Sequence, residues 1–175
     1  MINPGRPQAD SEFPPEFGRY IGLVTEDDIL AAMEAQEKTT AALLAPLSEE
    51  KATFRYAPDK WSIKQVIGHI SDGERIFAYR ALAIARGEQQ SLPGFEENDY
   101  VRAAGFDERP FSELRDAFAA ARRSTLLMLR GLSAEAWLRV GRANNNPTSV
   151  RAVAYGLLGH ERHHLQVLRE RYLSA

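Results

Sequence analysis

Four segments of this 175-residue chain repeat apolar residues every three or four positions, and this spacing constrains the fold more than any other feature. It predicts four long amphipathic helices, each with one face to bury. The first is predicted from an N-cap at Thr25 to near Pro46, the second from Ser62 to Gly87, and the third from Ser112 or the residue before it. The last follows Thr148 or Ser149 and runs nearly to the C-terminus. With no convincing strand pattern, the chain is predicted to be an all-α, four-helix bundle.

The remaining segments indicate how these helices are connected. Residues 1–20 carry four of the nine prolines and are predicted to form an irregular N-terminal lead-in to a single domain over residues 21–175. Residues 89–110 form a long mixed segment, which favours a crossover from one end of the bundle to the other. Short helical turns are expected near residues 97–104 and 133–139, and RANNNPTSV is expected to be a cluster of turns.

Composition excludes several classes of protein. A net charge of −2 leaves no broad basic face, so we expect no nucleic-acid partner. No apolar run approaches a membrane span and the first residues lack a signal-peptide pattern, so we expect no membrane partner and a cytoplasmic location. The sequence holds no cysteine, which excludes disulfides, thiolate metal ligands and a cysteine nucleophile.

Histidines occupy positions where a helix core is normally apolar. At roughly 100° per residue, the inward stripe of the last helix comprises Val153, Leu157, His160, His164 and Leu168. His160 and His164 are one turn apart and can converge on one point, whereas His163 points about 100° away from His164. On the second helix, His69 lies one turn before Gly73, which leaves space beside the imidazole.

Three neutral imidazoles suit zinc, nickel, cobalt or iron(II), and three ligands leave a coordination position open for water or substrate. The metal would then act as a Lewis acid, activate water or hold a thiolate. The competing interpretation is that the histidines are ordinary core or surface groups, because spacing alone does not make the two helices neighbours.

The chain resembles the DinB/YfiT-like family over nearly its whole length. The matching pieces are PPEFGRYIGLV, FRYAPDKWSIKQVIGHISDGERIFAYRAL, LPGFEENDYV and VRAVAYGLLGHERHHLQVLRERYL. The more specific ones are the Trp-Ser helix start leading to a histidine and the late His-x-x-x-His. The resemblance implies a four-helix bundle with up-down-down-up connectivity, a divalent metal ion on His69, His160 and His164, and a homodimer. Zinc or nickel is the expected metal, with manganese, cobalt and iron as alternatives.

Two functions remain open. The first is a metal-dependent transferase or hydrolase acting on a small molecule, because some relatives are thiol S-transferases that use a low-molecular-weight thiol. The second is a non-catalytic metal-binding or stress-response bundle. A pocket leading to the histidines favours the enzyme, and a fourth protein ligand favours the second function.

Several other polar or aromatic residues near these histidines have both a structural and a functional interpretation. Trp61 is expected to pack over the first turn of its helix, with substrate contact as the alternative, and Asp72 and Glu74 are expected to be solvated. Glu161 points about 100° away from His160 and is not expected to be a ligand. Four arginines could orient an anion, but ion pairing or solvation is expected instead: Arg75, Arg80, Arg162 and Arg169.

Overall fold

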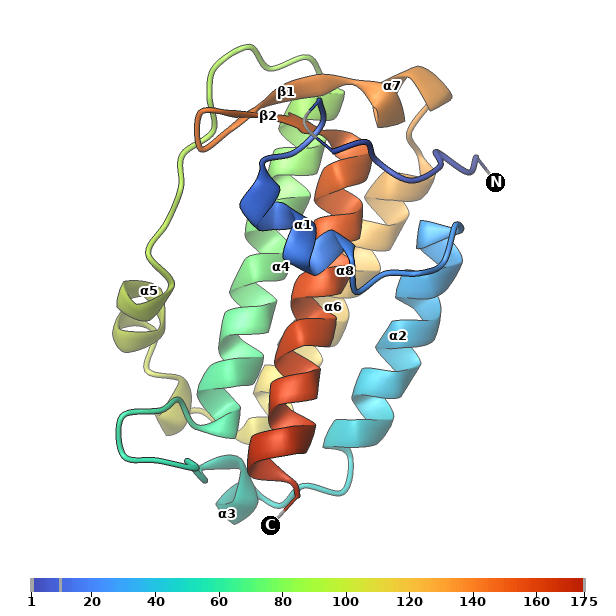
Figure 1. Cartoon of the computed structure of the whole chain (residues 1–175). Helices are drawn as coiled ribbons and strands as arrows, with labels where there is room; N and C mark the ends of the chain where they lie inside the picture. Colours follow the sequence, from blue (N-terminus) through green and yellow to red (C-terminus); the bar gives the residue numbers. More distant parts are fainter. Residues whose placement is uncertain (1, 10, 175) are drawn as a thin grey trace.

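Four long helices make up most of the computed structural model, which describes residues 2–9 and 11–174 (Figure 1). They are α2 (Ile29–Leu44), α4 (Ile63–Ala85), α6 (Phe111–Arg130) and α8 (Val150–Val167). Helices α2 and α8 run in one direction and α4 and α6 in the other, which confirms the up-down-down-up bundle. Within the described part of the chain, no helix is both long and apolar enough to cross a bilayer.

The connection between α4 and α6 is the predicted crossover. Because these neighbouring helices are parallel, residues 86–110 must return along the whole bundle, and they do so on the outer side of α4 (Figure 1). The connection contains the short helix α5 (Glu97–Ala103) and a 3-10 turn at Phe106–Glu108.

Side-chain caps fix where most of these helices start. Ser62 caps α4 and forms a capping box with Gln65, and Ser149 caps α8, both as predicted. Two predicted starts are wrong. The cap of α2 is Asp28, whose carboxylate accepts the Ala31 N–H, and not Thr25. Helix α6 begins at Phe111 after Pro110, which places Ser112 inside its first turn.

A small antiparallel hairpin stands where only turns were expected. Strands β1 (Val140–Ala143) and β2 (Asn146–Ser149) pair across Asn144 and Asn145, both at positive φ. Asparagine tolerates this left-handed conformation, which a two-residue hairpin turn requires. Each strand has only four residues and neither shows strict alternation, so its pattern gave no signal. The short helix α7 (Ala134–Leu138) precedes the hairpin, and α3 (Glu49–Ala52) joins α2 to α4.

The lead-in is less irregular than predicted, because its last residues are helical. A 3-10 turn at Pro15–Phe17 continues into α1 (Gly18–Ile21), which lies across α8 (Figure 1). A Cβ atom at Gly159 would lie 1.9 Å from the Tyr20 carbonyl oxygen, so this close backbone approach requires glycine. Upstream, the buried Glu12 carboxylate pairs with Arg151 of α8.

The bundle has two apolar cores and a polar layer between them. One core lies at the hairpin end and includes Met33, Phe77, Leu129 and Val153. The other lies at the α3 end and includes Ile67, Phe118 and Leu165, and α8 continues there into a π-helical turn at Leu168–Tyr172. The buried polar side chains between the cores come from all four long helices: Gln36, Thr40, His69, Ser71, Glu74, Arg122, Thr125, His160 and Glu161. The candidate functional groups of the bundle lie in this polar layer.

Candidate metal centre

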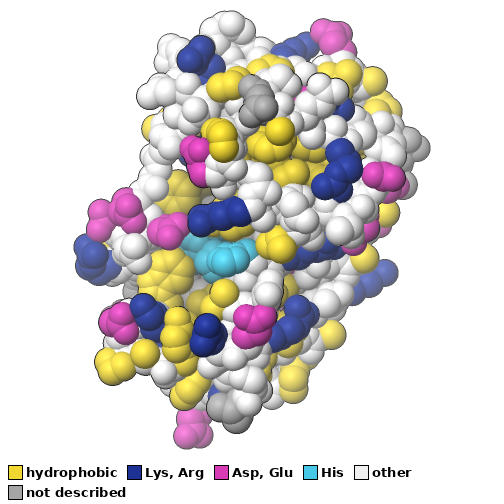
Figure 2. Space-filling model, in the orientation of Figure 1, with side chains coloured by type: hydrophobic (Ala, Val, Ile, Leu, Met, Phe, Trp, Pro, Cys, Tyr) yellow, Lys and Arg dark blue, Asp and Glu magenta, His cyan; other side chains and the backbone are white. Residues whose placement is uncertain are grey.

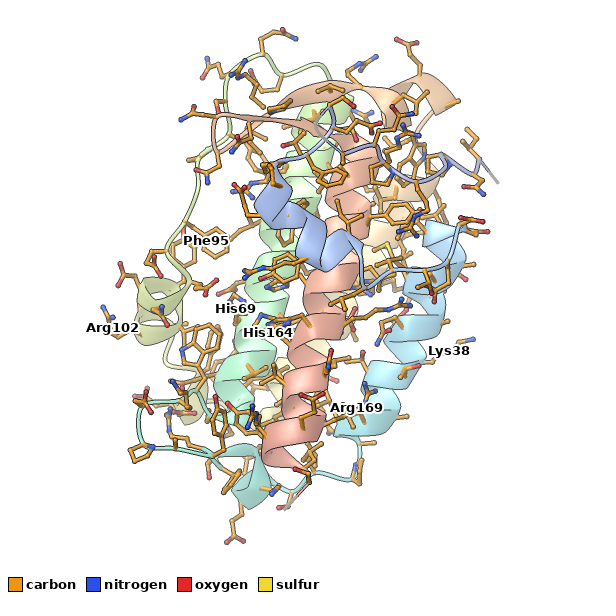
Figure 3. All side chains as sticks on the ribbon, viewed as in Figure 1. Lys38, His69, Phe95, Arg102, His164 and Arg169 are labelled. Carbon is orange, nitrogen blue, oxygen red and sulfur yellow. The ribbon has the colours of Figure 1, made fainter. Side chains whose placement is uncertain are left out.

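Three histidines from two helices meet in the polar layer. Helix α4 supplies His69 and helix α8 supplies His160 and His164, and Figure 3 shows the labelled His69 and His164 in the space between these helices. One ring nitrogen from each histidine lies within 4.8 Å of the others, and the two Nε2 atoms of His69 and His160 are 2.9 Å apart. The structure thus makes neighbours of the three predicted ligands.

This spacing fits a metal ion. Nitrogen ligands about 2.0–2.1 Å from a tetrahedral ion are about 3.3 Å from one another, which is between the shortest and the longest separation in the cluster. A Cβ at Gly73 would lie 3.0 Å from the His160 ring, so the space that this glycine leaves is beside His160 and not, as predicted, beside His69.

Burial keeps these imidazoles neutral, which is the form that binds metal. It lowers the pKa of His69 to about 4. It also lowers the pKa of His160 to about 3, to which the charges of His69, His163 and Arg19 contribute. The pKa of His164 is lowered by burial and by the same neighbours together with His160. In neutral solution all three therefore present a lone pair without first losing a proton.

A pocket leads from solvent to the third histidine. We call it the Trp61 pocket; it has a volume of about 250 Å³, and its walls include Tyr56, Trp61, Asn98, His163, His164 and Tyr172. The Trp61 ring is 4.8 Å from the His69 ring and stacks on the His164 ring at 6.3 Å. Figure 2 shows the histidine side chains reaching the surface within a hollow, with a basic side chain at its border. The Trp61 ring therefore packs against two of the three histidines and against the apolar core at the α3 end.

The model for the DinB superfamily matches residues 32–168, a span that contains all three histidines. This chain belongs to the DinB superfamily. A solved structure with a similar fold is that of YfiT from Bacillus subtilis, described as a probable metal-dependent hydrolase with an unusual four-helix bundle topology. The TM-score is 0.67 at 13% identity, over 96% of this chain and 97% of YfiT. No curated protein sequence matches.

In this DinB-superfamily bundle, His163 lies beside the triad without joining it. Its ring is 5.1 Å from that of His164 and 5.7 Å from that of Tyr20, and it is half-buried at the pocket wall. Within the described chain, the cluster contains three histidines and no carboxylate or fourth imidazole. Assignment of the three as metal ligands stays a prediction, made from helix geometry and from the family.

The DinB bundle also holds a buried ion cluster that sequence reasoning missed. Arg122 of α6 donates to both carboxylate oxygens of Glu74, and its Nη2 lies 2.8 Å from Glu161 Oε2. All three side chains are at most 2% exposed, so the expectation of a solvated Glu74 is wrong. Burial raises the pKa of Glu161, against the opposing effect of Arg122 and of the Thr40 hydroxyl. The sequence did offer one signal. Glu74 is a charged residue at a core position of its helix, because it lies four residues after Ile70 and three before Phe77.

The four arginines considered as anion-orienting groups have different surroundings. Arg162 forms an ion pair with Glu26, and Arg75 lies near Asp72 and donates to the Ser71 carbonyl, as expected of structural or solvated groups. Arg169 is exposed. Arg80 is half-buried and donates to the Pro93 carbonyl oxygen, and no carboxylate of the described residues pairs with it.

Proposed function

We propose that this protein is a metal-dependent hydrolase acting on a small molecule, with His69, His160 and His164 as the ligands of one divalent ion. One observation carries the proposal: three convergent neutral imidazoles have no fourth protein ligand among the described residues, and one of them lies on the wall of a pocket. Structural zinc sites are normally closed by a fourth protein ligand, whereas catalytic sites keep a position open.

The description of YfiT as a probable metal-dependent hydrolase supports the same reaction class. At 13% identity the likeness shows the fold alone. The support for a catalytic metal site therefore comes from the three histidines of this chain. They do so because ligand type, number and burial together match a catalytic site and not a structural one.

When bound, a divalent ion supplies a Lewis acid and activates water at neutral pH. In hydrolysis of an ester or amide, the water oxygen bonds to the acyl carbon and the bond from that carbon to the leaving group breaks. The leaving group takes up the proton that the water releases. Within this scheme the stacked Trp61 ring orients His69 and His164 and shields them from solvent on one side.

The test is hydrolysis of a panel of small esters and amides by protein loaded separately with zinc, nickel, manganese, cobalt or iron(II). We expect turnover that a chelator abolishes and that the metal restores. Turnover should also disappear in His160→Ala, whereas Glu34→Gln, which changes only an exposed ion pair with Arg130, should keep it. Turnover that survives both metal removal and His160→Ala would rule out the proposed site.

Two other results point to the alternative functions. A reaction that needs an added low-molecular-weight thiol would assign a thiol S-transferase, since the sequence has no cysteine of its own to supply the nucleophile. Tight metal binding with no exchangeable ligand would instead favour a non-catalytic metal-binding bundle. Exchange is measured on the cobalt-loaded protein, whose visible spectrum changes when azide or imidazole binds.

A further inference from the structure

A second cavity lies on the other side of Tyr20 from the Trp61 pocket, and two arginines line it. We call it the Arg19 cavity. It has a volume of about 170 Å³ and is enclosed by α1, α4 and the hairpin, with Arg19, Tyr20, Phe77, Arg80, Asn144 and Asn146 among its lining residues. Neither arginine has a carboxylate within ion-pair distance among the described residues.

Local contacts hold both guanidinium groups without neutralising them. Arg19 lies over the Tyr20 ring and donates to the Tyr20 hydroxyl at 2.8 Å. Arg80 lies near the Phe77 ring and donates one hydrogen bond to the Pro93 carbonyl oxygen. Burial lowers the pKa of Arg80, and no neighbouring carboxylate offsets this effect. Arg19 is exposed and Arg80 is half-buried, so both guanidinium groups can donate charge-assisted hydrogen bonds to an anion that enters the cavity.

The cavity adjoins the histidine cluster. Tyr20 and Phe77, which both line it, also pack against His160, with ring centroids 5.4 Å and 5.7 Å away. The Tyr20 and Phe77 rings are therefore a single layer of side chains between the cavity and His160.

The charges at the cavity indicate which anion it takes. Glu16 also lines it and is exposed, and no ion pair joins Glu16 to either arginine among the described residues. Two guanidinium groups and one carboxylate leave a single net positive charge, which matches a monoanion. The amides of Asn144 and Asn146 add neutral hydrogen-bond donors, and the small volume limits the ligand to a few heavy atoms at this end.

We propose that the Arg19 cavity binds a carboxylate group and that the substrate of the neighbouring histidine site is a small carboxylate-bearing molecule. The second half of this inference rests on the proposed function, whereas the first half does not, because the cavity needs no metal to bind an anion.

The first experiment uses the metal-free full-length protein, so its result is independent of any reaction. Acetate and inorganic phosphate are titrated separately at constant ionic strength, and binding is followed by nuclear magnetic resonance of the arginine Nε–H and asparagine side-chain amides. We expect acetate to shift the signals of Arg19, Arg80 and Asn144. Arg19→Gln should weaken acetate binding about tenfold, in line with loss of one charge-assisted hydrogen-bonding group.

Control variants separate loss of the anion site from loss of the fold. Arg86→Gln changes an exposed arginine that caps the C-terminal end of α4 and does not line the cavity, so this variant should bind acetate as the wild type does. Arg80→Lys keeps the charge and should weaken binding less than Arg80→Gln. Unchanged acetate affinity in Arg19→Gln, or a response to phosphate without one to acetate, would overturn the carboxylate site.

The second experiment compares a hydrolysable ester bearing a free carboxylate with its neutral methylated analogue on the metal-loaded enzyme. Arg19→Gln should raise KM for the charged ester about tenfold and leave KM for the neutral ester unchanged. Equal changes in KM for both esters would show that the cavity does not bind the carboxylate of the substrate. If neither ester is hydrolysed while acetate still binds through Arg19, the hydrolase proposal fails and the carboxylate site stands.

Discussion

Glu161 faces Arg122 although it directly follows His160, whose ring faces His69. The two consecutive residues of α8 point to different neighbours: His160 toward α4 and the histidine cluster, and Glu161 toward α6 and the buried ion cluster. The polar layer therefore contains a histidine cluster and an ion cluster, and adjacent residues of α8 contribute to each.

Arg122→Met should lower the free energy of unfolding by about 3–5 kcal/mol, because it leaves two buried carboxylates without their cation. Arg130→Met is the matched control on the same helix. Its ion pair with Glu34 is exposed, so its loss should cost less than about 1 kcal/mol. Both values come from urea denaturation. Equal losses in the two variants would mean that the buried cluster contributes no more than a surface pair.

Metal content should depend on three histidines and not on the fourth. Replacing His69, His160 or His164 by alanine should remove most of the bound ion, and His163→Ala should retain it, because His163 lies outside the cluster. Elemental analysis after identical loading and dialysis gives the answer. Loss in His163→Ala with retention in His160→Ala would show that the ligands have been assigned to the wrong face of α8.

The metal-free protein should lose stability as the pH falls from about 6.5 to about 4. An unfolded histidine takes up a proton near pH 6.5, whereas burial lowers the pKa of folded His69 to about 4. Below pH 6.5 the unfolded state thus binds more protons, and its free energy falls relative to the folded state. The effect of His69 alone is on the order of 3 kcal/mol.

Urea unfolding midpoints at pH 7.5, 6 and 5 test this dependence. His69→Gln, which does not titrate in this range, should show a shallower slope than the wild type. Saturating zinc should raise stability at pH 7.5 more than at pH 5, because metal and protons compete for the same nitrogens. A wild-type slope equal to that of His69→Gln would contradict the prediction.

Gly159→Ala should be destabilised by about 1–3 kcal/mol, because the new Cβ would overlap the Tyr20 carbonyl oxygen and force α1 away from α8. At Gly131 a Cβ meets only ordinary contacts, so Gly131→Ala should change stability by less than about 0.5 kcal/mol. Thermal unfolding of both variants measures the difference. The Tyr20 signals in nuclear magnetic resonance spectra should move in Gly159→Ala alone.

The sequence was sufficient to predict the helices because their apolar spacing and serine caps are local signals. Ser62 and Ser149 carry cap chemistry within three residues, and the predicted starts of α4 and α8 agree with the structure. Thr25 failed as a cap because Asp28, three residues on, offers a competing acceptor. The β1–β2 hairpin was not predicted, because two four-residue strands are too short to show an alternating pattern.

The candidate site was predictable only in part. The positions of His160 and His164 followed from helical geometry, but their proximity to His69 needed the family resemblance, because no local signal states which helices are neighbours. Glu74 and Glu161 became buried through a partner on a third helix, Arg122, which lies far away in the sequence. Arg19 and Tyr20 gave no signal, because α1 has only four residues and is placed by its contact with Gly159. The homodimer and the cytoplasmic location stay predictions.

The parallel arrangement of α4 and α6 has an evolutionary consequence. It obliges residues 86–110 to travel the length of the bundle, and Asn98 of this connection forms part of the Trp61 pocket. The three histidines lie on α4 and α8, which the connection does not interrupt. Insertions, deletions or substitutions in this connection can therefore change the shape of the Trp61 pocket while the long helices and the imidazoles keep their positions. Substrate selectivity can thus diverge without loss of the four-helix bundle.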